Sequence, residues 1–162
     1  MRPVGADSGR VVPADERAGY PLFAYGTLMF GEVLDGLIGR RPPVTAAVLP
    51  GWRAARLPGR VYPGLVPAPG GQAGGLLVTG LNADEWAVFD AFEGDPYLLR
   101  EVALGSPPPP ARPATPGAAD QPVRTVLTYA WRDLDDVEDD DWDPGWFAAH
   151  RLGRYAARLR AW

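Results

Sequence analysis

A strand signal that runs directly into a helix signal constrains the fold more than any other feature of this sequence. Residues 75–81, Gly-Leu-Leu-Val-Thr-Gly-Leu, form the short apolar run that is typical of a buried strand. Asn82 then provides a helix N-cap, and Glu85 follows three residues later, where its side chain completes a capping box. Gly94 ends the helix. The pattern therefore predicts a buried strand followed by a helix that ends near Glu93.

The remaining elements follow from weaker signals of the same kinds. Strand-like runs occur at residues 21–25, 44–49, 60–67, 97–104 and 123–131, and helical spacing of apolar residues occurs at 28–38 and 144–162. We expect turns at Pro50-Gly51 and at Pro69-Gly70-Gly71, and an edge or irregular strand at 60–67 because that run holds two prolines. This order predicts an α+β fold, with a mixed sheet of about six strands curled into a small barrel and flanked by helices.

The 162 residues suffice for one domain with a core around a pocket. Residues 1–20 lack periodicity and are predicted to be a flexible tail. The domain itself is expected at residues 21–131, with a loop at 106–122 whose seven prolines need not pack. Residues 132–162 are expected to form an acidic linker and a C-terminal helix that packs on the domain.

The composition excludes several catalytic classes. The chain has no Cys and no Lys, since all 16 basic residues are Arg, so thiolate nucleophiles, Cys-bound metals and Schiff bases are excluded. His150 is the single histidine, and both serines lie in segments poorly suited to holding a nucleophile, which disfavours a Ser-His-Asp triad. Proton transfer without a cofactor must then use carboxylates or tyrosines. We expect neither a cofactor nor a metal.

The charge and hydropathy of the chain limit its partners. The net charge is −4, which argues against nucleic acid as a general partner. No apolar run approaches the ~20 residues of a membrane span, and the N-terminus lacks a signal-peptide core. A cytoplasmic protein with a small-molecule ligand is the expectation, and the oligomeric state stays open.

Glu93 is the leading candidate for acid/base chemistry. It lies where the helix stops and a strand begins, beside Phe92 and Tyr97. A carboxyl in aromatic, partly dry surroundings has a raised pKa, which suits a general base near neutral pH. The alternative is that Glu93 caps the helix or forms an ion pair with Arg100.

A second candidate is the turn Tyr25-Gly26-Thr27-Leu28 between the first strand and the helix after it. Gly26 allows a close approach to the backbone, and successive N–H groups there are suited to binding an anion. The turn lacks the glycine spacing of a dinucleotide or phosphate loop, and an ordinary strand-turn-helix connection is the alternative.

Several segments taken together resemble the AIG2-like branch of the γ-glutamylcyclotransferase family. They are Tyr25-Gly26-Thr27-Leu28, Gly51-Trp52-Arg53, Arg60-Val61-Tyr62-Pro63-Gly64, Asp90-Ala91-Phe92-Glu93-Gly94 with the following Tyr97 and Arg100, and Tyr129 in a late strand. The resemblance covers residues 22–131 in the same order, and the C-terminal helix looks like the extension of plant-type and bacterial members.

The resemblance implies a small mixed barrel with one cavity and a reaction that needs no cofactor. It implies that residues 25–28 bind the α-amino-acid end of a γ-glutamyl group through backbone atoms. Glu93 would be the general acid/base, and Tyr129 would line the pocket. The implied reaction is an intramolecular aminolysis of a γ-glutamyl amide, which gives 5-oxoproline and a free amine or amino acid.

Other hypotheses remain beside this one. The same barrel could hold a metabolite without turning it over, or the glutamate could act on a different amide. Arg53, Tyr97 and Arg100 are further candidates for the site, although both arginines are equally suited to structural ion pairs. The acidic run of residues 133–143 lacks the glycine punctuation of a calcium loop and is expected to be a solvated surface.

Overall fold

The computed structural model describes residues 19–94, 96–104 and 125–160. The expected tail at 1–20, apart from its last two residues, and the Pro-rich loop at 106–122 lie outside this part. The strands are β1 (Leu22–Ala24), β2 (Val44–Arg56), β3 (Pro63–Val78), β4 (Tyr97–Ala103) and β5 (Thr125–Trp131). The helices are η3 (Thr27–Met29, a 3-10 turn), α1 (Gly31–Ile38), α2 (Ala83–Glu93), α3 (Pro144–His150) and α4 (Leu152–Arg160).

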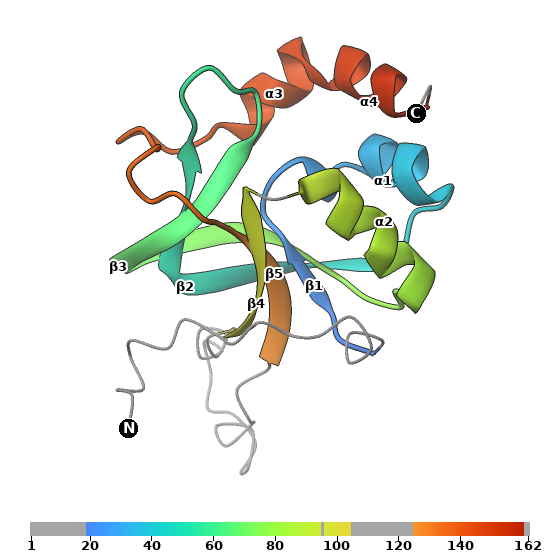
Figure 1. The fold of residues 1–162 in the computed structure, drawn as a ribbon, viewed down its shortest axis with the longest axis horizontal. Coiled ribbons are helices and arrows are strands. Elements are labelled where there is room, and N and C mark those ends of the chain that lie inside the picture. Colours follow the sequence, from blue (N-terminus) through green and yellow to red (C-terminus); the bar gives the residue numbers. More distant parts are fainter. Residues whose placement is uncertain (1–18, 95, 105–124, 161–162) are drawn as a thin grey trace, which may run out of the picture.

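The five strands form one mixed sheet in the order β2-β3-β1-β5-β4. β1 is antiparallel to β3 and parallel to β5, and β3 also meets β5 directly at Leu65 and Ala130. Because β3 lies beside three other strands, the sheet curls strongly, with helices α1 and α2 beside it (Figure 1). The α+β class is confirmed. Within the described residues the sheet is open, so the term barrel applies only loosely.

β2 and β3 are longer than the sequence predicted. β2 continues through Pro50-Gly51, where its register against β3 shifts, and Gly51 takes the positive φ of 85° that this irregularity needs. β3 continues through Pro69-Gly70-Gly71, so both predicted turns are wrong. The expected strands at 60–67 and 75–81 are the two ends of one strand. That strand is central rather than at an edge, and it tolerates Pro63 because this residue begins it.

Helix α2 begins and ends as predicted. The Asn82 side chain accepts from the Glu85 amide at 2.9 Å, and the Asn82 amide donates to the Glu85 carboxylate at 3.1 Å. At the other end, Gly94 adopts a φ of 72° and its N–H donates to Asp90. Trp86 is buried below the helix in the core. The two caps therefore fix Glu93 as the last helical residue.

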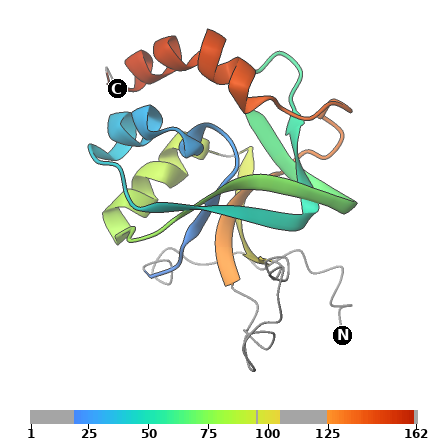
Figure 2. The same ribbon diagram turned by 180° about the vertical axis from the view of Figure 1, so that it is seen from behind.

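The predicted C-terminal helix is two helices, α3 and α4, which are separated at Arg151. Asp143 caps α3 and Pro144 takes its first position, as the sequence indicated. α4 packs against α1 on the outside of the domain (Figures 1 and 2). The buried Phe147 ring lies 5.4 Å from that of Tyr155, so the α3–α4 pair is anchored to the core.

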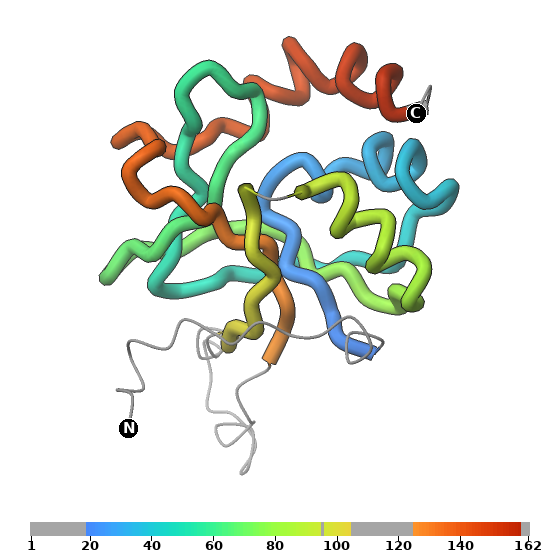
Figure 3. Tube along the Cα trace, in the orientation of Figure 1, coloured from blue at the N-terminus to red at the C-terminus, as the bar shows by residue number. Residues whose placement is uncertain are grey.

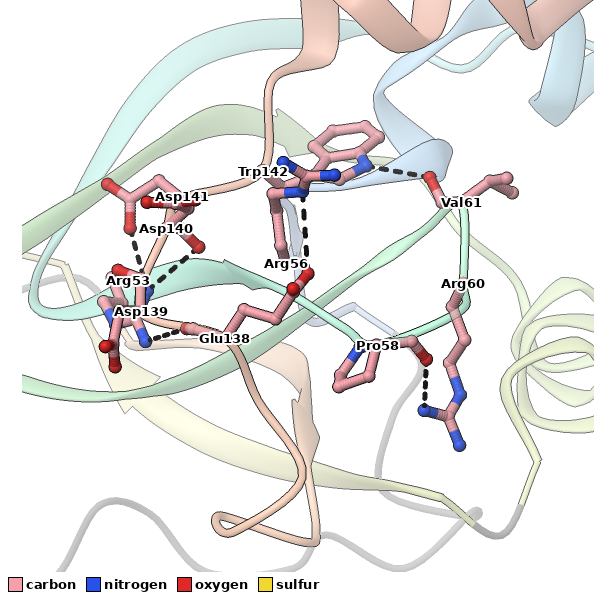
Figure 4. Close-up of polar contacts among 10 residues, drawn as sticks. All are labelled: Arg53, Arg56, Pro58, Arg60, Val61, Glu138, Asp139, Asp140, Asp141 and Trp142. Atoms are coloured by element: carbon pink, nitrogen blue, oxygen red, sulfur yellow. Dashed lines mark hydrogen bonds and ion pairs between the residues drawn. The ribbon is translucent and has the colours of Figure 1, made fainter.

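The acidic segment is an ordered strap, defined here as residues 133–142, and not simply a solvated surface. It lies beside β2 (Figure 4), and a backbone bridge joins Ala55 of β2 to Asp141. The Arg53 guanidinium donates to the Asp141 carboxylate at 3.0 Å and to the backbone carbonyls of Glu138 (2.7 Å), Asp140 (3.3 Å) and Asp139 (3.4 Å). Arg53 on β2 therefore holds the acidic segment in place, although the sequence predicted this segment to be a linker.

The strap also holds the loop between β2 and β3, which rises toward α3 (Figure 3). The Trp142 indole N–H donates to the Val61 carbonyl at 2.8 Å, and Arg60 pairs with Asp136 at 3.0 Å. The residue after Val61 is Tyr62, which lines the pocket described next. The position of the strap is thus linked to one wall of that pocket.

Candidate active site

A cavity of about 120 Å³ opens at the end of β1, between the η3 turn, the end of α2, the start of β3 and helix α4. The structure brings seven of the nine predicted site residues together around it: Tyr25, Gly26, Thr27, Leu28, Glu93, Tyr97 and Tyr129. Segments far apart in the sequence therefore converge on one pocket, and the expected meeting of the first turn with the end of the middle helix is observed.

Residues of the η3 turn line the pocket with their backbone close to β3. Its first hydrogen bonds run from Met29 N to Gly26 O at 3.0 Å and from Phe30 N to Thr27 O at 3.2 Å. The amides of Thr27 and Leu28 precede these donors, so they have no partner within the turn. A Cβ on Gly26 would lie 2.8 Å from Cγ of Pro63, so glycine is required for β3 to approach this closely. The turn is therefore suited to binding an anionic or carbonyl oxygen.

Glu93 provides the acidic group of the pocket. The residue is half-buried, and burial of its carboxyl raises the pKa to about 8. Its position at the C-terminal end of α2, where the helix dipole disfavours negative charge, acts in the same direction. Among the described residues, none donates a hydrogen bond to this carboxyl. Glu93 is therefore mostly protonated at neutral pH, and it can gain and lose a proton at a pH close to neutral.

Three of the lining tyrosines use their hydroxyl protons to hold the framework together. Tyr97 donates to the Pro63 carbonyl at 2.7 Å, Tyr129 donates to the Asp90 carboxylate at 2.8 Å, and Tyr25 donates to the Tyr129 carbonyl. Burial raises the pKa of both Tyr25 and Tyr97 well above the ordinary value. These side chains thus tie β4 to β3, β5 to α2, and the end of β1 to β5.

Sequence reasoning missed two further tyrosines that line the pocket, Tyr62 in the β2–β3 loop and Tyr155 on α4. Burial raises the pKa of Tyr155 to about 12. The sequence did place Tyr155 on the apolar stripe of the last helix. Its hydroxyl could have indicated a site, because the hydroxyl of a tyrosine on a buried helix face needs a hydrogen-bond partner or a polar cavity.

Arg53 and Arg100 do not line the pocket. Arg53 holds the strap, and Arg100 lies on β4 opposite Thr128 of β5. His150 is exposed, with its ring stacked on that of Trp146 at 4.8 Å. The described residues contain no group of three or more His, Asp or Glu side chains that could hold a metal ion, and no helix among them is long and apolar enough to cross a membrane.

Fold and site together define a class: a small α+β protein with a curled mixed sheet, in which a buried carboxyl and the amides of a tight turn share one pocket. Residues 22–144 match the family described as gamma-glutamyl cyclotransferase, AIG2-like, and the chain belongs to this family. The match ends at the start of α3, so α4 lies beyond it.

Curated relatives come from Arabidopsis thaliana. AIG2-like protein C is 33% identical over 123 residues, which cover 75% of this chain and 64% of that protein. AIG2-like protein D is 30% identical over 119 residues, which cover 74% of this chain and 72% of that protein. The matched region of AIG2-like protein A, at 37% identity, spans half of that relative's length and 51% of this chain.

Solved structures share the fold at lower identity. An Arabidopsis thaliana protein studied in solution superposes with a TM-score of 0.60 at 22% identity, over 95% of this chain and 85% of that one. A structure titled gamma-glutamyl cyclotransferase superposes with a TM-score of 0.55 at 16% identity, over 88% of this chain and 87% of that one. These likenesses support the architecture.

Proposed function

We propose that this protein is a cofactor-independent γ-glutamylcyclotransferase, which converts a γ-glutamyl amide into 5-oxoproline and a free amine or amino acid. Glu93 is the general acid/base, and the amides of the η3 turn bind the α-amino-acid end of the substrate. The observation that carries the proposal is that a carboxyl whose pKa is about 8 shares one pocket with these amides. Family membership and the γ-glutamylcyclotransferase-like fold support it.

The reaction fits a chain without cysteine or lysine because the substrate brings its own nucleophile. The ionised Glu93 takes a proton from the α-ammonium, and the resulting amine attacks the γ-carbonyl carbon to close a five-membered ring. As the bond to the departing nitrogen breaks, Glu93 returns the proton to that nitrogen, and it then relays a second proton from the ring nitrogen in the same way. The lactam nitrogen keeps one of the three ammonium protons, and the other two leave on the departing amine as an ammonium ion.

Positioning contributes heavily to such a ring closure. Holding the amine against the carbonyl makes the step unimolecular, with effective molarities that reach about 10⁵ M or more in favourable cases. The buried tyrosines of the pocket hold its walls rigid, and backbone amides of the turn stabilise negative charge that develops on oxygen. One carboxyl for proton transfer then suffices.

The direct test is Glu93→Gln, which keeps the size of the side chain and removes the acid. Release of 5-oxoproline from a panel of γ-glutamyl amides, followed by mass spectrometry, should fall by about 10²–10⁴-fold. Glu138→Gln is the matched control, because that carboxylate is exposed on the strap at 3.7 Å from Arg56. Retention of full activity by the Glu93 variant, at an unchanged melting temperature, would refute the assignment.

A second candidate is a non-catalytic module that binds a small metabolite. It is favoured by one specific observation: Glu93 is mostly protonated at neutral pH and so can donate a hydrogen bond to a ligand without any turnover. Compounds that raise the melting temperature of the wild-type protein and are recovered unchanged would support this function over the first.

A further inference from the structure

Among the described residues, the pocket offers an anion only neutral hydrogen-bond donors. None of the described residues that line it is an arginine or histidine, and the chain has no lysine. A carboxylate that enters must therefore be met by neutral donors, which here are backbone amides and hydroxyl groups. The hydroxyl protons that remain available consequently decide which ligand oxygens the pocket can hold.

Most of the tyrosine hydroxyls cannot serve, because each has a single proton. Those of Tyr25, Tyr97 and Tyr129 are already donated to a carbonyl or carboxylate of the protein. The remaining lining hydroxyls belong to Thr27, Tyr62 and Tyr155.

Thr27 and Tyr155 form a hydroxyl pair. Both line the pocket and Thr27 is 6% exposed; burial chiefly raises the pKa of Tyr155, while a hydrogen bond from the Thr27 side chain lowers it and the charge of Glu93 raises it. Two hydroxyls carry two protons, and one hydrogen bond between them uses one. Among the described residues nothing accepts the other, so the pair retains one donor for a ligand.

Packing holds the Tyr155 ring in place. It contacts Phe92 at 6.3 Å and Phe147 at 5.4 Å between ring centroids, both close to edge-to-face. Phe147 is fully buried, and α4 is held against α1. The hydroxyl is therefore fixed beside the η3 turn at little entropic cost when a ligand binds.

We infer that the Thr27–Tyr155 hydroxyl pair donates a hydrogen bond to the α-carboxylate of the substrate, which makes Tyr155 a specificity-determining residue for a free carboxylate. The inference rests on the proposed function. Thr27 belongs to the turn whose amides, under the proposed function, bind the same end of the substrate, so side-chain and backbone donors would converge there. Tyr155 comes from α4, which lies beyond the family-matched residues 22–144.

The inference predicts selectivity between two ligands that differ in one group. γ-Glutamylmethylamide has the common α-end and the smallest alkyl amide, and its α-carboxamide analogue replaces the carboxylate oxygen by an NH₂ donor. A hydrogen bond to a charged acceptor is stronger than one to a neutral acceptor. Tyr155→Phe should therefore weaken binding of the carboxylate about 10-fold and change binding of the carboxamide less than about 2-fold.

Titration calorimetry on the full chain with Glu93→Gln, which prevents turnover, measures both dissociation constants. Tyr20→Phe is the matched control, because its hydroxyl donates to Glu101 at 3.0 Å and does not line the pocket. Thr27→Val should give a similar loss of selectivity. The double variant should lose no more than either single one, because the two residues act as a unit.

Three outcomes would overturn the inference: equal weakening of both ligands in Tyr155→Phe, loss of selectivity in Tyr62→Phe instead, or no binding of γ-glutamylmethylamide. None of them decides the proposed function. That function stands or falls on whether the wild-type protein releases 5-oxoproline from any of the larger γ-glutamyl compounds.

Discussion

Helix α2 has a glutamate near each end, and the two side chains have opposite electrostatic surroundings. Glu85, at the beginning, is held by Arg40 with two N–O distances of 2.6 Å and accepts from the Asn82 amide. The Arg40 hydrogen bond, followed by the Asn82 amide, lowers its pKa. Glu93, at the end, has no such donors among the described residues, and burial raises its pKa to about 8.

The difference shows how one helix provides both an anchor and a reactive group. At the N-terminal end a cation and the helix dipole stabilise the charge, so the carboxylate is ionised at neutral pH and stabilises the helix start. At the C-terminal end the helix dipole and burial of the carboxyl oppose the charge, which raises the pKa of Glu93. The capping box of Asn82 and Glu85 fixes the first end of the helix, and Gly94 fixes the other directly after Glu93.

The largest expected effect is the pH dependence of turnover. Glu93 must be ionised to accept the first proton, so kcat/KM should rise about 10-fold per pH unit below a midpoint near 8, or about 10³-fold between pH 5 and 8. Rates of 5-oxoproline release across this range measure it. Glu85→Gln should keep the midpoint. A midpoint near 4.5 in the wild type would contradict the raised pKa of Glu93, and a midpoint that is unchanged in Glu93→Asp and Glu93→Gln would show that another group is the base.

The next effect concerns stability at the other end of the helix. Glu85→Gln removes the ion pair with Arg40 while its side-chain oxygen can still accept from the Asn82 amide, and it should cost about 2 kcal/mol at pH 7 in urea unfolding. Because the folded pKa is lowered, this contribution is present above pH 4.5 and is lost as the pH falls through the folded value. If Glu85→Gln were still less stable than the wild type at pH 2, the electrostatic explanation would be contradicted.

Glu93→Gln should change the free energy of unfolding in the opposite direction to Glu85→Gln, and by a smaller amount. The raised pKa means that the folded state keeps its proton between about pH 4.5 and 8 while the unfolded chain does not, so wild-type stability declines over that window. The variant should be more stable than the wild type by about 1 kcal/mol at pH 9, an amount reduced by partial solvent access, and equal to it at pH 4. Thermal unfolding at both pH values checks this, and a stabilisation that does not depend on pH would argue against it.

The smallest effect is expected where carboxylates are exposed. Asp136 pairs with Arg60 at 3.0 Å, and the two side chains are 36% and 34% exposed. Asp136→Asn should therefore cost about 0.5 kcal/mol or less, and 1 M salt should remove the difference. A loss well above 1 kcal/mol would mean that the strap stabilises the β2–β3 loop through this pair rather than through Trp142.

Local chemistry explains which features could be predicted from the sequence. The capping box of α2, the Asp143-Pro144 start of α3 and the glycine stop after Glu93 each depend on residues a few positions apart, and all three are observed. The turns at Pro50-Gly51 and 69–71 were wrong because pairing with a neighbouring strand absorbs these residues as irregularities.

The missed features depend on tertiary contacts. Nothing local indicates that the acidic run would lie along β2, since that requires Arg53 to meet its backbone carbonyls from more than eighty residues away. In the same way Tyr155 reaches the pocket only because α4 packs on α1. The family resemblance placed Glu93 and the turn at residues 25–28 in one site, and it matched the C-terminal helix to an extension of some members without giving Tyr155 a place in the pocket.

The pocket walls come from residues as far apart as Leu22 and Tyr155, and this separation has a kinetic consequence. Contacts between such distant residues form late when a chain refolds, because closing the intervening loops costs entropy before any contact repays it. Recovery of ligand affinity after dilution from denaturant should therefore lag behind the recovery of helical circular dichroism. Partly folded intermediates of this chain would be unable to bind.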